Sequence, residues 1–246
     1  MRDPGGRWRH CIIVPPLALF LAIVTPAAAR CAPSAPTITV EATKSFGDSY
    51  GPLTNDGAED RSSGDLRVGY RRGRFVVEFR YGRSGYTTEN DGPGSRTVLP
   101  TFGGGTASVP FFHAVESRTE LRALVNAGAL PFAAGFGVFR ADTNYGFPVL
   151  SGIGIGVSGT SRPYRRFMLD SSVFYYPNVL GAYRSLTIRF RVLSADAAIA
   201  YPIVHSSLWV VAGYRNEYRE PISLPSAFAQ VRSSPYLGIR QILGRE

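Results

Sequence analysis

The sequence predicts an all-β protein that closes into a single transmembrane antiparallel β-barrel of about ten strands, with eight or twelve strands left open. Three observations predict this fold. Apolar residues alternate with charged or small residues along most of the chain, long connections alternate with short ones, and an export signal precedes the alternating part. A strand with one apolar and one charged face suits lipid on one side and water or ion pairs on the other.

The alternation is clearest in the segment 74–82, where every second residue is apolar and most of the residues between are charged. The apolar set is Phe75, Val77, Phe79 and Tyr81, and the opposite set is Arg74, Glu78, Arg80 and Gly82. Successive side chains of a strand point to opposite faces, so this segment predicts a strand with a lipid-facing side and a lumen-facing side.

The same two-residue period, with turn residues between the runs, predicts ten strands in all. They cover residues 36–46, 64–71, 74–85, 117–126, 130–140, 148–158, 166–176, a stretch that begins near 183, 206–218 and 229–243. In the eighth strand the apolar residues change parity after Val192, and we predict a β-bulge near Leu193 and Ser194 that restores the two faces. A break into two strands at this point would change the strand count.

The connections between these strands alternate in length. The long or polar ones cover residues 47–63, 86–116, 141–147, 177–182 and 219–228, and the short ones cover 72–73, 127–129, 159–165 and 202–205. Membrane barrels of this kind have long extracellular loops and short periplasmic turns, so the order of connections places both chain ends in the periplasm. We expect the longest loop, 86–116, to carry any specific binding, because function concentrates in loops on a rigid scaffold.

The start of the chain has the layout of a secretory signal peptide. A basic segment precedes an apolar segment at residues 11–24, and the small residues at 27–29 offer a cleavage site. We expect cleavage after Ala29, which leaves a short segment 30–35 ahead of a barrel domain at 36–244. Cys31 follows the site and keeps a lipoprotein anchor open, although Arg30 before it is not a small residue. No later segment is long and apolar enough for a transmembrane helix.

The net charge of +9 comes almost wholly from arginine, because Lys44 is the only lysine. The arginines are spread singly through alternating strands, which argues against a nucleic-acid-binding patch. Arginine also suits inward-facing pairs with carboxylates, and we predict a charged network that fills a narrow lumen. Its predicted members are Glu41, Asp65, Arg67, Arg71, Glu78, Arg80, Glu120, Arg122, Asp170, Arg189, Arg191, Arg215 and Arg240. The excess of arginine keeps open a small pore that favours anionic solutes.

Catalytic patterns are weak in this sequence. His205, Ser206 and Ser207 resemble the His-x-Ser arrangement of some outer-membrane lipid A deacylases, but no nearby acid clearly orients the base that a serine nucleophile needs. His113 lies in the longest loop, and a membrane-embedded hydrolase built on either histidine remains an alternative. No Cys/His pattern indicates a metal site. We therefore expect no catalytic residue, no metal and no cofactor.

The chain resembles bacterial outer-membrane β-barrel proteins as a class, over residues 36–244. The segments 208–215 (LWVVAGYR) and 236–243 (YLGIRQIL) are similar to strands of that class. The resemblance implies a place in the outer membrane, with lipid and the barrel-assembly machinery as partners. Such barrels commonly end in an aromatic residue that the assembly machinery recognises, whereas this chain ends Leu243-Gly244-Arg245-Glu246.

We expect a structural or surface-binding role without catalysis. The alternatives are the anion-favouring pore, the hydrolase, and a soluble secreted or periplasmic β-protein. The ligand and the oligomeric state stay open.

Overall fold

The computed structural model describes residues 35–51, 54–59, 63–86, 96–101, 105–110, 114–126, 131–161, 166–183, 186–203, 207–224 and 228–244. The predicted export signal lies outside the described residues. No helix in the described part of the chain is long and apolar enough to cross a membrane.

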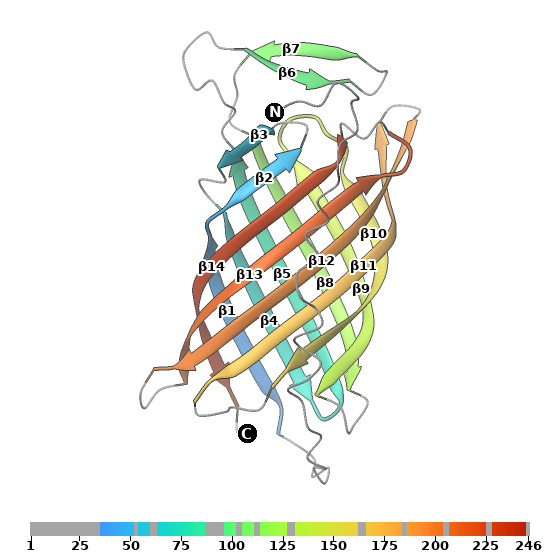
Figure 1. The fold of residues 1–246 in the computed structure, drawn as a ribbon. Helices are drawn as coiled ribbons and strands as arrows, with labels where there is room; N and C mark the ends of the chain where they lie inside the picture. The colour runs from blue at the N-terminus through green and yellow to red at the C-terminus, as the bar shows by residue number, and fades with distance from the viewer. Residues whose placement is uncertain are drawn as a thin grey trace, which may run out of the picture.

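Ten long antiparallel strands form a closed barrel (Figure 1). They are β1 (Thr37–Ser45), β4 (Gly64–Arg72), β5 (Phe75–Tyr86), β8 (Ala114–Asn126), β9 (Phe132–Thr143), β10 (Leu150–Thr160), β11 (Met168–Tyr183), β12 (Leu186–Pro202), β13 (Leu208–Pro221) and β14 (Gln230–Leu243). Each strand pairs with its neighbour along the chain, and β1 closes the ring by pairing with β14 from Ile38 opposite Leu243 to Ser45 opposite Tyr236. The predicted all-β barrel of ten strands is confirmed.

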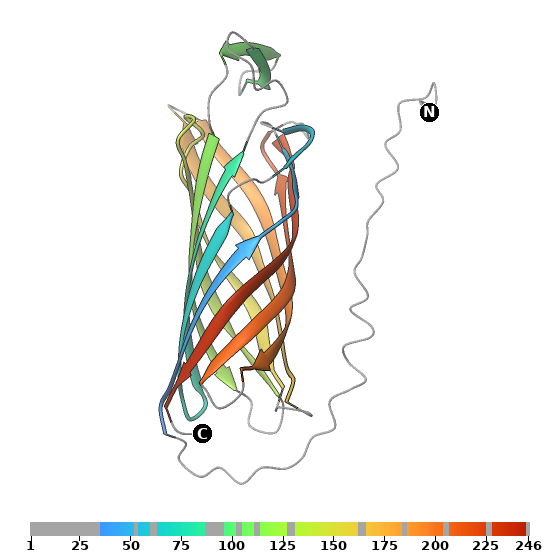
Figure 2. The ribbon, with the colours of Figure 1, turned by 90° about the vertical axis from the view of Figure 1, so that its left-hand side faces the viewer.

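Four short strands lie at the end of the barrel opposite the start of β1 and the end of β14. The strands β2 (Asp48–Gly51) and β3 (Thr54–Glu59) form a hairpin that extends the sheet beyond β14. The strands β6 (Arg96–Pro100) and β7 (Thr106–Pro110) form a separate two-stranded sheet within the longest connection. Figure 2 shows this small sheet standing above the rim of the barrel. We call this end the loop end and the other the turn end.

The outer wall carries large apolar side chains that no other described part of the chain covers. Phe136 and Ile153 are each 67% exposed, although they lie in the middle of paired strands. On β5 the predicted facing is confirmed, because Phe75, Val77 and Phe79 are exposed while Glu78 and Arg80 are buried. A continuous apolar outer face on a closed sheet is the pattern of a barrel that is surrounded by lipid.

The strands β8 and β11 are each at least three residues longer than the sequence predicts. β8 begins at Ala114 rather than at 117, and β11 continues to Tyr183, so the predicted loop 177–182 is wrong. A register shift between Tyr176 and Val179 in the β11–β12 pairing marks a β-bulge at Pro177 and Asn178. A bulge tolerates a proline within a sheet, which is why these two residues interrupt the pattern without ending the strand. Only residues 184–185 connect β11 to β12, so the alternation of long and short connections fails here.

The predicted bulge near Leu193 and Ser194 is also wrong. β12 pairs with β13 residue by residue from Phe190 opposite Pro221 to Pro202 opposite Trp209, with no shift in register. Its buried residues are all at even positions from Ile188 to Ala200. The even-numbered side chains of β12 therefore point inward along the whole strand. What changes along the strand is whether the residues on each face are apolar or polar.

Candidate functional site

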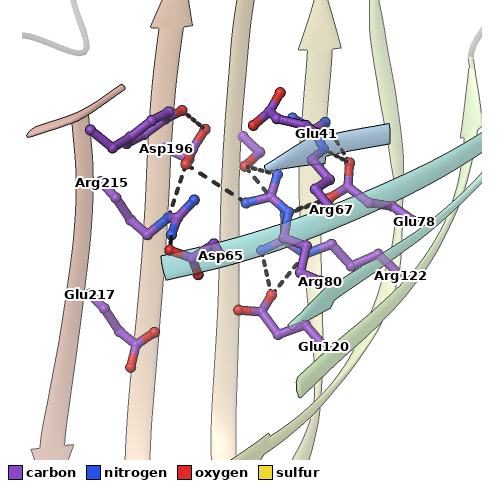
Figure 3. A network of polar contacts seen from close by, with 12 residues as sticks. Glu41, Asp65, Arg67, Glu78, Arg80, Glu120, Arg122, Asp196, Arg215 and Glu217 are labelled. Atoms are coloured by element: carbon purple, nitrogen blue, oxygen red, sulfur yellow. Dashed lines mark hydrogen bonds and ion pairs between the residues drawn. The ribbon is translucent and has the colours of Figure 1, made fainter. Parts of the chain in front are cut away.

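The inside of the barrel holds a network of arginines and carboxylates that comes from strands on opposite walls. Alternation places these side chains inward, so that β5 contributes Glu78 and Arg80 and β8 contributes Arg118, Glu120 and Arg122. Figure 3 shows the side chains of β5 and β8 pointing across the lumen toward those of β12 and β13.

Glu78 is one centre of the network. Its carboxylate accepts hydrogen bonds from Arg67 of β4 and Arg80 of β5, each over 2.5 Å, and from Arg122 of β8 over 3.3 Å. Arg67 forms its ion pair with Glu78, whereas Arg80 and Arg122 each have a second carboxylate partner. Hydrogen bonds between ionised groups are stronger than neutral ones, and several on one carboxylate fix its position.

Glu120 is a second centre and joins the charges to an aromatic wall. It accepts hydrogen bonds from the Arg122 Nε atom over 2.9 Å and from the Tyr176 hydroxyl over 3.1 Å, and Arg118 lies 3.4 Å away. The Arg122 guanidinium carbon lies 3.9 Å from the centre of the Phe174 ring, in the geometry of a cation–π contact. Arg122 and Glu120 are both 0% exposed.

Glycines on β10 make room for these aromatic side chains. A Cβ atom on Gly154 would lie 2.4 Å from the Tyr176 ring, and one on Gly156 would lie 2.5 Å from the Phe174 ring. The Gly152–Gly156 segment therefore serves close packing against the wall of the lumen, and both rings are fully buried.

The network continues to the far wall through Asp196 of β12. This carboxylate lies 3.8 Å from Arg80 and accepts hydrogen bonds from Arg215 and from the Tyr236 hydroxyl, each over 3.1 Å. Arg215 also pairs with Asp65 of β4. Because β4, β5, β12, β13 and β14 all contribute, ion pairs span the whole width of the barrel.

Toward the loop end the network continues through Glu217. Arg118 and Arg219 both pair with this carboxylate, and Arg219 also donates to Glu116 over 2.9 Å and to Gln230 over 2.9 Å. On the β1–β14 seam, Arg240 pairs with Glu41 over 2.7 Å and with Asp170 of β11.

The interior charges nearly balance. Among the described residues, seven arginines and eight carboxylates form ion pairs inside the barrel. They are Arg67, Arg80, Arg118, Arg122, Arg215, Arg219 and Arg240, with Glu41, Asp65, Glu78, Glu116, Glu120, Asp170, Asp196 and Glu217. Arg232 also faces inward on β14 and donates to Ser63, which makes the two signs equal in number.

Ten of the thirteen side chains that the sequence predicts inside lie in these ion pairs, and three do not. Arg71 has the inward parity of β4 but lies exposed at the turn end of the strand. Arg189 and Arg191 are exposed on the outside of β12, so their predicted inward facing is wrong. The alternation predicts that Ile188, Phe190 and Val192 face lipid, whereas these three side chains are buried inside the barrel.

Five paired residues were not predicted from the sequence. They are Glu116, Arg118, Asp196, Glu217 and Arg219. Four of them continue the parity of predicted members on β8 and β13, and that period could have identified them. Asp196 lies on the side of β12 that the predicted bulge turns toward the lumen, so the alternation after Val192 could have identified it as well.

One side of the lumen is apolar rather than charged. Toward the loop end, Phe139, Val179, Ile188 and Phe190 of β9, β11 and β12 pack together, and Phe228 from the segment between β13 and β14 packs among them. His113 and His205 lie outside the described residues, as does much of the predicted binding loop 86–116. Within the described ranges no group of three or more His, Cys, Asp or Glu side chains is placed to hold a metal ion.

The sequence matches no protein-family profile, and no curated protein is significantly similar to it. Among solved structures, the chain is similar to the outer-membrane-expressed OmpT of Vibrio cholerae, with 16% identity over 74% of this chain and 56% of that chain and a TM-score of 0.33. This chain therefore spans little more than half of that protein's length.

Two further solved structures are also similar to this chain. One is Ail, the attachment invasion locus protein of Yersinia pestis, in complex with the heparin analogue sucrose octasulfate, with 12% identity, coverage of 85% and 99%, and a TM-score of 0.29. The other is the outer membrane channel DcaP of Acinetobacter baumannii, with 10% identity, coverage of 86% and 96%, and a TM-score of 0.23. The assignment of the barrel rests on its own strand pairing and not on these likenesses.

Proposed function

We propose that this protein is an outer-membrane β-barrel whose lumen is closed by its own side chains, and that it serves as a rigid structural or surface-binding platform without catalysis. The observation that carries the proposal is the layer of buried ion pairs that crosses the lumen. Arg122 and Glu120 in this layer are 0% exposed, and Glu78, Arg80 and Arg118 are buried beside them.

The outer wall supports a place in a membrane. Its exposed residues are apolar over the middle of the strands, and exposed tyrosines lie near strand ends at Tyr70 and Tyr201 on the turn side and Tyr218 on the loop side. Tyrosine favours the level of lipid headgroups, so two such girdles suit a barrel that crosses one bilayer. The export signal that the sequence predicts agrees with a bacterial outer membrane.

The balance of interior charge argues against an anion-favouring pore. The expected excess of arginine came partly from Arg71, Arg189 and Arg191, which are not part of the interior network. The paired arginines inside are matched by at least as many carboxylates among the described residues. A passage that favours anions would need arginines that face water, as in the charged rings of ion-selective pores.

The loop end supports surface binding rather than transport. The longest connection carries the paired strands β6 and β7, which stand clear of the barrel rim (Figure 2). A hairpin carried on a barrel is a surface that a partner can bind.

Planar-bilayer recording tests the proposal. We expect the refolded chain 30–246 to migrate faster unboiled than boiled on SDS gels and to show no steady conductance. Replacing the central pair in the variant Glu120→Ala/Arg122→Ala should open a path and produce conductance. Leu121→Ala is the matched control, because Leu121 lies between these two residues but is 49% exposed on the outer wall. Steady, anion-selective conductance of the unchanged protein would overturn the closed lumen, and solubility without detergent would overturn the membrane barrel.

A further inference from the structure

The outer face of β12 changes character at Leu193. From Tyr201 up to Leu193 the outward residues are Tyr, Ile, Ala, Ala and Leu, whereas the next two outward residues toward the loop end are Arg191 and Arg189. Both arginines are exposed, and the Arg191 side chain is 51% exposed. The outside of the strand thus turns from apolar to cationic within one residue pair.

The inner face of the same strand changes in the opposite sense at the same level. Below it the buried residues include Asp196 and Ser194, and above it they are Val192, Phe190 and Ile188. A wall with lipid outside can hold polar groups within, whereas a wall with water outside needs an apolar core like any soluble sheet. This inversion marks the level at which lipid tails end and headgroups begin on this side of the barrel.

Neighbouring strands place aromatic side chains at this level. Leu193 lies opposite Tyr175 of β11 and opposite Tyr218 of β13, and both tyrosines are exposed on the outer wall. The next outward position on β13 is Glu220, opposite Arg191. Two tyrosines with an arginine just beyond them form an aromatic girdle followed by a cationic step.

We propose that Arg189 and Arg191 bind the phosphate groups of anionic lipids in the leaflet at the loop end. The proposal rests on the membrane barrel proposed above. The two side chains stand on one face of one strand, about 7 Å apart along it, which suits one phosphorylated headgroup. The planar guanidinium presents paired N–H donors that match phosphate oxygens and is weakly hydrated.

The existing partners leave these arginines available. Arg191 lies 3.3 Å from Glu220 in a pair whose side chains are 51% and 45% exposed. Exposed ion pairs of this kind add little stability, so a phosphate can replace the carboxylate. No carboxylate of the described residues lies within ion-pair distance of Arg189. Glu220 is therefore a competitor for the phosphate, and its removal should strengthen lipid binding.

Native mass spectrometry of the refolded chain 30–246 in dodecyl maltoside tests this proposal. The probes are dimyristoyl phosphatidic acid and, for comparison, dimyristoyl phosphatidylcholine. We expect the unchanged protein to prefer the phosphatidic acid. R189Q/R191Q should weaken phosphatidic acid binding by about fivefold for each arginine, and E220Q should strengthen it by a similar factor. R189K/R191K, which keeps the charge but lacks the planar paired donors, should retain only part of the preference.

The matched control is R72Q/R74Q, which removes two exposed arginines at the β4–β5 turn on the opposite end of the barrel. We expect it to change phosphatidic acid binding by less than about twofold, which is less than the about fivefold effect expected for losing one arginine–headgroup contact. An unchanged preference in R189Q/R191Q, or an equal loss in the control, would overturn the lipid site. The heat-dependent gel shift separates the two proposals, since a shifted band without lipid preference contradicts only the site. If R189Q/R191Q does not refold, R189Q alone and E220Q carry the test, with opposite expected signs.

Discussion

Removal of the Glu78 carboxylate tests whether the interior network stabilises the barrel. Glu78 accepts from three arginines, but Arg80 also pairs with Asp196 and Arg122 also pairs with Glu120. In Glu78→Gln only Arg67 loses its carboxylate partner among the described residues. The expected cost is therefore that of breaking one buried ion pair, about 3–5 kcal/mol, and not three times that figure. Because the Arg67 side chain is 18% exposed, we expect the lower end of this range.

The assay is urea unfolding of the refolded barrel in lipid vesicles, followed by the fluorescence of Trp209. The matched control is Glu220→Gln, the same chemical change in a pair that is 45% exposed at the carboxylate. An exposed pair contributes about 0.2–1 kcal/mol, so the control should lose little. Adding Arg67→Gln to Glu78→Gln removes the unpartnered charge and should recover part of the loss. Equal free energies of unfolding for the two single variants would refute the reasoning.

Three further predictions concern packing and facing. Val77→Arg places a charge on the lipid-facing wall and should lower the free energy of unfolding by about 2–4 kcal/mol near the bilayer midplane, measured in the same titration. If an arginine at an exposed position near the loop end lowered the free energy of unfolding by the same amount, the lipid facing of Val77 would be contradicted. Gly154→Ala should cost about 1–3 kcal/mol, because its Cβ atom would lie 2.4 Å from the Tyr176 ring; a neutral effect would show that this ring is not held against the wall. Phe228→Ala should cost about 3–5 kcal/mol by leaving a cavity in the apolar side of the lumen, and loss of the segment's protection from proteases should accompany it; no change in either measurement would contradict its burial.

The strands that lie at membrane level throughout could be predicted from the sequence. On β5 the facing of Val77 and Glu78 follows from period two alone, because the outward residues are apolar from Phe75 to Tyr81 and the inward Glu78 and Arg80 lie among ion pairs. The β1–β14 pair that closes the barrel also follows the predicted parity, with Glu41 opposite Arg240. A two-residue period shows which side chains share a face of a strand. It shows which face points outward only where the same environment borders each face along the strand.

Where the surroundings change, sequence patterns give the wrong answer. On β12 the apolar residues are at odd positions where lipid lies outside the barrel, and at even positions where an apolar core lies inside it. The sequence pattern of this unbroken strand is therefore the same as that of a strand with a bulge. β11 has a real bulge at Pro177 and Asn178, and these residues imitate a loop. Which carboxylate meets which arginine depends on the width and stagger of the closed sheet, and a single strand does not contain that information.

Cysteine labelling distinguishes the inversion on β12 from a bulge. In a Cys31→Ser background, Arg191→Cys should react with a polyethylene glycol maleimide in intact vesicles, because the side chain stands in water at the headgroup level. Ile199→Cys should stay unreactive until detergent replaces the lipid, since Ile199 is on the same face of the strand within the apolar belt. Phe190→Cys should be protected in both conditions, because that position is 0% exposed inside the barrel. A bulge at Leu193 would reverse the first and third results, with position 190 on the outer wall and position 191 in the lumen. The change in gel mobility that the maleimide causes in these three variants therefore distinguishes a bulge in β12 from an unbroken strand that passes out of the lipid layer.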